Sequence, residues 1–147
     1  MDRREFIKST CVSCGVLSLM STFPLAMLQS CVSLPMIRTS TAEKNIVVAK
    51  SKLSPDKKIH ILRNDDIQYD ILLVQSPDST YYALYMQCTH QDNALTANDK
   101  GLMCNAHGST YDLQGKVTNG PATQTLRKYE VIEKNEALII NLSHLIS

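Results

Sequence analysis

Two short motifs that combine cysteine with histidine constrain this chain more than any other feature of its sequence. The first is Cys88-Thr89-His90, and the second is Cys104-Asn105-Ala106-His107. Thiolate and imidazole are ligands of zinc, and together they also bind iron–sulfur clusters in which two His replace two Cys on one iron. Because each motif supplies one thiol and one imidazole, the two motifs predict one metal site held between two loops.

The hydroxyl groups that follow the second motif favour an iron–sulfur cluster over zinc. Gly108-Ser109-Thr110-Tyr111 comes directly after His107. The sulfur atoms of a cluster accept hydrogen bonds, and these bonds tune its reduction potential. A structural zinc site has no evident need for such donors. We therefore expect a cluster, and a zinc-stabilised binding module is the alternative from a different class of protein.

Together with Gly120-Pro121-Ala122, these motifs resemble those of the Rieske [2Fe–2S] proteins, and the resemblance extends from about Leu72 to the C-terminus. It implies an all-β fold of stacked antiparallel sheets with a small cluster-binding subdomain, and one [2Fe–2S] cluster per chain. It also implies that Cys88 and Cys104 bind one iron, and that His90 and His107 bind the other. By the same resemblance, Ser109 donates a hydrogen bond to a bridging sulfide and Tyr111 donates one to a cysteine sulfur. The loop at residues 120–122 is implied to cover the cluster.

The chain departs from the respiratory Rieske proteins in both loops. Those proteins carry an additional cysteine in each loop, and the two cysteines form a disulfide; here the corresponding residues are Asn93 and Ala106. The leucine that usually follows the first histidine is Gln91, which weakens the apolar surface that docks at a quinol site. Ser109 and Tyr111 nevertheless follow the high-potential pattern. We therefore expect a potential above those of the ring-hydroxylating ferredoxins and below those of the respiratory quinol oxidases.

The chain after residue 45 predicts β-strands and no long helix. Runs rich in Ile, Val, Leu and Tyr are separated by turn residues, and no sustained helical period is present. Asp112-Leu113-Gln114-Gly115 predicts a turn between two further short strands, 109–112 and 116–118. His60 alternates with Ile59 and Ile61, so we expect it at a surface or edge position. The six main strands are predicted at 45–50, 57–63, 69–75, 81–87, 128–133 and 137–142.

The N-terminal segment resembles an export signal. Arg3-Arg4-Glu5-Phe6-Ile7-Lys8 is similar to the twin-arginine signal, and Leu28-Gln29-Ser30-Cys31 resembles a lipobox that would make Cys31 a lipidated N-terminus. An uncleaved membrane helix and a free periplasmic protein are the alternatives. We therefore divide the chain into a signal peptide or membrane anchor at 1–30, a tether at 31–44 and a Rieske domain at 45–147. We expect the protein to lie at the periplasmic face of the cell membrane.

Length and charge narrow the class of function. A chain of 147 residues suggests one domain, and residues 31–147 contain 12 basic and 12 acidic side chains, a balance that argues against nucleic acid as a partner. No nucleophile–base pair or mononuclear iron triad is apparent. We therefore expect an electron carrier that exchanges single electrons with a redox protein or enzyme complex, and no catalytic residues.

Two further alternatives concern the partner and the cysteines. The chain could instead be the Rieske subunit of a quinol-oxidising or molybdenum oxidoreductase complex, with quinol bound through a partner subunit. A disulfide between Cys88 and Cys104 is the simplest alternative to metal binding in an exported protein. That disulfide would leave His90 and His107 without a role.

Overall fold

The computed structural model describes residues 33–146. The arginine pair, the lipobox and Cys31 lie outside these residues, so the predictions made for them stay predictions. The regular secondary structure of the described part is strand, apart from one 3₁₀ turn, η1 (Lys50–Lys52). No helix within it is long and apolar enough to cross a membrane.

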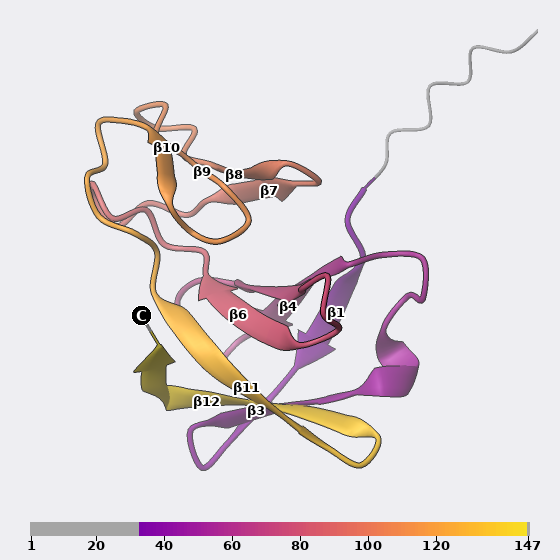
Figure 1. Ribbon diagram of the computed structural model, residues 1–147. Helices are drawn as coiled ribbons and strands as arrows, with labels where there is room; N and C mark the ends of the chain where they lie inside the picture. The colour runs from indigo at the N-terminus through magenta and orange to yellow at the C-terminus, as the bar shows by residue number, and fades with distance from the viewer. Residues whose placement is uncertain (1–32, 147) are drawn as a thin grey trace, which may run out of the picture. The chain divides into compact units, whose positions relative to one another are not determined.

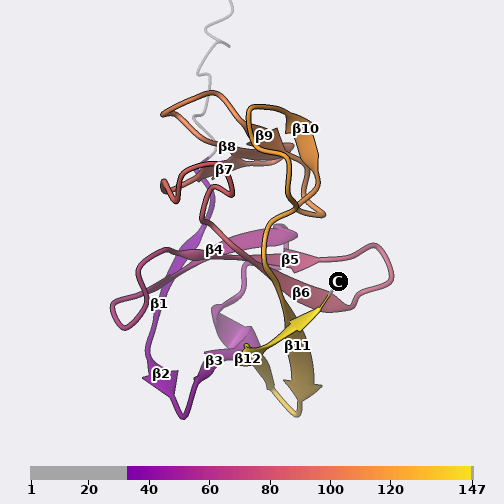
Figure 2. The ribbon, with the colours of Figure 1, turned by 90° about the vertical axis from the view of Figure 1, so that its left-hand side faces the viewer.

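The larger of two sheets has eight strands in the order β1-β4-β5-β6-β11-β12-β3-β2 (Figures 1 and 2). All neighbours in it are antiparallel except β1 and β4, which are parallel. The sheet curls, so that β1 and β3 come into contact although they are not neighbours in it. Its strands are β1 (Met36–Thr39), β2 (Thr41–Ala42), β3 (Asn45–Ala49), β4 (Ile59–Asn64), β5 (Ile71–Gln75), β6 (Tyr81–Tyr85), β11 (Lys128–Lys134) and β12 (Ala137–Ile146).

The smaller sheet is an insertion between two strands that are neighbours in the larger one. Strands β6 and β11 pair directly with each other, and the chain between them forms four short strands in the order β10-β9-β8-β7. Both views show this sheet and its loops on one side of the larger sheet. Its strands are β7 (Thr96–Asn98), β8 (Gly101–Met103), β9 (Thr110–Tyr111) and β10 (Val117–Asn119).

Strand β5 explains how the two sheets are joined. Successive side chains of a strand point to opposite faces, and here Ile71, Leu72, Leu73 and Val74 are all buried. Ile71 and Leu73 belong to the core inside the curl of the larger sheet, whereas Leu72 and Val74 belong to a second core. That second core also contains Leu102 of β8 and Tyr111 of β9, so β5 is buried on both faces and supports the smaller sheet.

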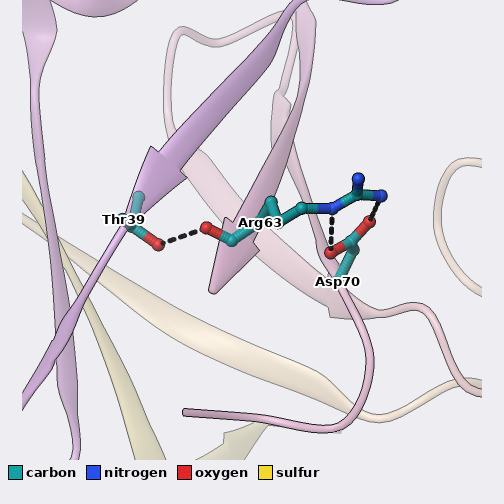
Figure 3. Close-up of polar contacts among 3 residues, drawn as sticks. All are labelled: Thr39, Arg63 and Asp70. Atoms are coloured by element: carbon teal, nitrogen blue, oxygen red, sulfur yellow. Dashed lines mark hydrogen bonds and ion pairs between the residues drawn. The ribbon is translucent and has the colours of Figure 1, made fainter. Parts of the chain in front are cut away.

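An ion pair between Arg63 and Asp70 closes the β4–β5 hairpin (Figure 3). Arg63 at the end of β4 donates from Nε and Nη2 to the two carboxylate oxygens of Asp70, at 3.2 and 2.8 Å. Thr39 Oγ1 of β1 donates to the Arg63 carbonyl at 3.2 Å. The Asp70 carbonyl in turn accepts the N–H of Met86 at 3.0 Å, two residues before Cys88. The hairpin therefore also fixes the start of the first cysteine loop.

All six main predicted strands are present, and the prediction of an all-β fold is confirmed. The predicted turn at residues 112–115 does connect two short strands, β9 and β10. The predicted tether was wrong for residues 36–42, because β1 pairs with β4 and β2 pairs with β3. The ordered sheet begins at Met36, before the predicted boundary at residue 45.

His60 is buried rather than at the surface, contrary to the expectation from its strand pattern. Its side chain is 2% exposed, and its Nε2 accepts the backbone N–H of Ser54 at 2.9 Å. Burial lowers the pKa of this imidazole. The segment that follows η1, which contains Ser54, folds over the start of β4. His60, which strand alternation alone would leave in solvent, is therefore covered.

Candidate metal centre

The two cysteine–histidine motifs form loops with the same backbone hydrogen bonds. In the first loop, Cys88 N–H donates to the Asn93 carbonyl at 2.8 Å, and its carbonyl accepts from Asp92 N–H at 3.0 Å. In the second loop, Cys104 N–H donates to the Ser109 carbonyl at 2.8 Å, and its carbonyl accepts from Gly108 N–H at 2.9 Å. Each cysteine therefore lies at the closed base of its loop, and each histidine projects from the turn.

A left-handed residue makes each of these turns possible. It is Asp92 in the first loop, with φ 47°, and Gly108 in the second, with φ 79°. Glycine adopts this conformation without steric cost, and aspartate tolerates it better than most residues do. The Asp92 carboxylate also accepts a hydrogen bond from Gln87 Nε2 at 2.9 Å, which ties the turn to the strand end below it.

The thiols and the imidazoles separate into a buried pair and an exposed pair. Cys88 and Cys104 are both 0% exposed, and both are free thiols. The alternative of a disulfide between them is therefore contradicted. His90 and His107 are exposed, and their ring centroids lie 5.0 Å apart with the planes nearly perpendicular. Within residues 33–146, no three ligand-type side chains gather around one ion position.

The environment of Cys88 favours a thiolate, which is the form that binds metal. Burial raises the pKa of the Cys88 thiol, but hydrogen bonds from the Tyr111 hydroxyl, from the backbone of His90 and Gln91 and from the Cys104 thiol bring that pKa below its usual value. The Tyr111 hydroxyl oxygen lies 3.5 Å from Cys88 Sγ. Burial and the neighbouring thiol raise the pKa of Tyr111, so its hydroxyl keeps its proton.

Ser109 supplies a buried hydroxyl whose proton has no acceptor among the described residues. Its side chain is 0% exposed, and its oxygen accepts the N–H of Ala122 at 3.0 Å. A buried donor left without an acceptor is costly, by about 1–3 kcal/mol. A group with hydrogen-bond acceptors beside Ser109, such as the sulfide of a cluster, would satisfy it. The donor set at this site therefore fits a [2Fe–2S] cluster.

A third loop contacts both motif loops. It contains the cis Gly120–Pro121 peptide bond. Asn119 Nδ2 donates to the carbonyl of Gly108 at 3.2 Å, and Ala122 N–H donates to Ser109. The Gln124 carbonyl accepts a hydrogen bond from Thr89 Oγ1 at 2.7 Å. The segment predicted to cover the cluster, residues 120–122, is thus hydrogen-bonded to the second loop through Ala122, and the residues that flank it add bonds to the second loop from Asn119 and to the first loop from Gln124.

Sequence reasoning missed Thr89 as a member of the site. Its backbone N–H donates to the Tyr111 hydroxyl at 3.1 Å, and its own hydroxyl lies 3.0 Å from the same oxygen. The only signal in the sequence was its position between Cys88 and His90. Gln124, whose part in the site is a backbone carbonyl, gave no signal at all.

Comparison with known proteins identifies the family of this chain. The Rieske [2Fe-2S] domain family matches residues 38–130, and the chain belongs to this family. Family membership confirms the prediction of one Rieske [2Fe–2S] cluster and supports electron transfer as the general function. The cluster would be held at the site described above.

Curated relatives match only part of their own length. The chain is 34% identical over 73 residues to the cytochrome b6-f complex iron-sulfur subunit of Parasynechococcus marenigrum (strain WH8102), covering 48% of this chain and 41% of that protein. The subunit of the same name from Synechococcus sp. (strain RCC307) is 36% identical over the same length and coverage. The chain therefore matches about two fifths of the length of these relatives.

Two solved structures share the fold. One is a chain from the complex of reduced oxygenase and oxidized ferredoxin in carbazole 1,9a-dioxygenase, with TM-score 0.50, 21% identity, and coverage of 69% of this chain and 95% of that chain. The other is the quaternary ammonium Rieske monooxygenase CntA in complex with L-carnitine, with TM-score 0.54 and 18% identity. The match covers 67% of this chain and 32% of the CntA chain. At these identities the likeness concerns the fold alone.

Proposed function

We propose that this chain is a membrane-tethered periplasmic electron-transfer protein in which Cys88 and Cys104 bind one iron and His90 and His107 bind the other. The observation that carries this proposal is the separation of a buried thiol pair from an exposed imidazole pair, both held by matching loops. A [2Fe–2S] cluster supplies one-electron redox chemistry when it is bound. The protein residues hold it, keep water from the thiol side and leave the imidazole side open to a partner.

Apart from the two imidazoles, the surface at the tips of the three loops has no ionisable side chain, and the exposed carboxylate of Asp92 follows directly after it in the first loop. We call this surface the histidine face, and define it as residues 90–91, 105–108 and 119–121, all of which are exposed and none of which is Asp, Glu, Lys or Arg. A face of this kind suits a partner that recognises it through shape and hydrogen bonds. Charge attraction, which accelerates many electron-transfer encounters, has little to act on here.

The partner is proposed to be a redox protein or enzyme complex. The matched relatives are named as subunits of the cytochrome b6-f complex, which supports a complex as one possibility. In that case quinol would be bound through a partner subunit. Gln91 lies on the histidine face where respiratory relatives have an apolar residue, and this favours an independent carrier or a different complex.

The proposed location rests on the N-terminal sequence. Arg3-Arg4 is proposed to direct twin-arginine export, and Cys31 is proposed to carry the lipid anchor, with an uncleaved helix as the alternative. Since the sheet begins at Met36, the tether between Cys31 and the domain would be short. Replacing Arg3-Arg4 with two lysines should leave the protein in the cytoplasm, and Cys31→Ser should release it from the membrane if Cys31 is lipidated. Membrane retention and unchanged size in Cys31→Ser would favour the uncleaved helix.

Ligand substitutions test the cluster assignment. Cys88→Ala and Cys104→Ala should lose most of the bound iron, and His90→Cys or His107→Cys should lose the Rieske spectral signature, because imidazole on one iron defines it. His144→Ala is the matched control, since His144 is exposed and paired with Glu130 away from the site. Iron content, visible absorption and electron paramagnetic resonance are the measurements. A colourless protein that contains zinc would establish the binding-module alternative, and full iron content in all four ligand variants would refute the assignment.

A further inference from the structure

The Tyr111 hydroxyl has more neighbours than a simple tyrosine–cysteine contact requires. Its oxygen lies 3.5 Å from Cys88 Sγ and 3.0 Å from Thr89 Oγ1. It also accepts the backbone N–H of Thr89 at 3.1 Å. Tyr111 is 2% exposed, so these groups and not solvent decide where its proton points.

The number of protons available determines the direction of each bond. Thr89 Oγ1 lies 2.7 Å from the Gln124 carbonyl, which can only accept, so the single hydroxyl proton of Thr89 is used there. The contact between the two hydroxyl oxygens is then a hydrogen bond only if Tyr111 donates. The single hydroxyl proton of Tyr111 therefore has two competing acceptors, Thr89 Oγ1 and Cys88 Sγ.

We propose that Thr89 is a positioning residue that withdraws the Tyr111 proton from the Cys88 sulfur and thereby lowers the reduction potential of the cluster. This proposal rests on the proposed binding of iron by Cys88. The Gln124 carbonyl holds the Thr89 hydroxyl so that its oxygen faces Tyr111. The third loop thus takes part in setting the potential without contributing a ligand.

The sign of the effect follows from the charge of the two redox states. Oxygen is the stronger acceptor when the sulfur carries little charge, and a donated hydrogen bond strengthens when electron density on the sulfur increases. In the oxidised state the Tyr111 proton is therefore held mainly by Thr89, and in the reduced state it shifts toward Cys88. Removing the Thr89 hydroxyl destabilises the oxidised state more than the reduced state, so the potential rises.

The test compares Thr89→Val, which removes the hydroxyl and keeps the shape, with Thr89→Ser, which keeps the hydroxyl. Midpoint potentials are measured by protein-film voltammetry on the full chain, after iron content has been matched. Thr89→Val should increase the equilibrium constant for reduction by up to about tenfold. For one electron, this is a rise in the midpoint potential of up to about 59 mV. Thr89→Ser should stay near the wild-type value. If Thr89→Val does not retain iron, Thr89→Ala makes the same comparison.

A double-mutant cycle separates this role from a structural one. In a chain that carries Tyr111→Phe, the competing proton is absent, so adding Thr89→Val should no longer raise the potential. The proposal would be overturned if Thr89→Val shifted the midpoint potential equally with and without Tyr111→Phe. It would also be overturned if neither Thr89→Val nor Thr89→Ala raised the midpoint potential. These outcomes differ from a failure of the ligand assignment, which would appear as full iron content in Cys88→Ala.

Discussion

Gly101 is the position at which a single methyl group should do most damage to the metal centre without touching a proposed ligand. A Cβ added there would lie 2.1 Å from the Tyr111 carbonyl oxygen and 3.2 Å from its carbonyl carbon. Carbon and carbonyl oxygen approach each other to about 3.3 Å at closest in ordinary contacts. Strands β8 and β9, which pair through Leu102 and Tyr111, must therefore separate by roughly 1 Å.

The energetic cost can be assembled from two contributions. Forcing extra volume into a packed site costs about 1–3 kcal/mol, and stretching one strand-to-strand hydrogen bond beyond about 3.2 Å forfeits roughly 1 kcal/mol. We expect Gly101→Ala to reduce the free energy of unfolding by about 2–4 kcal/mol, which corresponds to a melting temperature lower by roughly 10–20 °C. Because the displaced Tyr111 also carries the hydroxyl beside Cys88, iron content should fall as well.

Thermal unfolding followed by circular dichroism, with iron measured in the same samples, tests this expectation. Gly120→Ala is the matched control, because a Cβ there meets nothing closer than 3.9 Å. The control should stay within about 0.5 kcal/mol of the wild type. If Gly101→Ala is equally mild, the close approach of β8 to β9 is not what holds Tyr111 in place.

Three further predictions concern pH, the buried serine and the histidine face. Burial lowers the pKa of His60, so as pH falls the unfolded chain binds this proton before the folded chain does. The contribution of His60 to stability should therefore be constant above about pH 6.5 and fall below it by at most about 1.4 kcal/mol per pH unit. Guanidinium unfolding should show this slope in the difference in stability between the wild type and His60→Gln. Ser109→Ala leaves the buried N–H of Ala122 without an acceptor, so the free energy of unfolding should fall by about 1–3 kcal/mol. The same substitution should lower the midpoint potential measured by voltammetry. An unchanged potential would mean that the Ser109 hydroxyl does not reach the cluster. Electron exchange with small cationic and anionic metal complexes should depend weakly on ionic strength in both cases, and a steep dependence of opposite sign for the two would contradict a histidine face of little charge.

Most of the candidate site could be predicted from the sequence, because its chemistry is concentrated in two short motifs. Cys88, His90, Cys104 and His107 each lie in a five- or six-residue loop whose shape depends on local hydrogen bonds and one left-handed residue. Local information is sufficient for such loops. The apolar runs that became β3 to β6, β11 and β12 could be predicted for the same reason, since alternation and turn residues are properties of neighbouring positions.

The features that only the tertiary structure decided all depend on residues far apart in the chain. Strand β1 forms because β4, more than 20 residues later, offers a parallel edge, and the run at 36–42 carries no strong signal of its own. His60 is buried because another segment covers it. Thr89 becomes part of the metal centre only when folding brings Tyr111 and Gln124, 22 and 35 residues away, to its hydroxyl. The sequence alone thus determined which groups are proposed to bind the cluster. The packing of distant strands and loops determined which groups surround those proposed ligands, because hydrogen-bond partners of this kind depend on proximity in space.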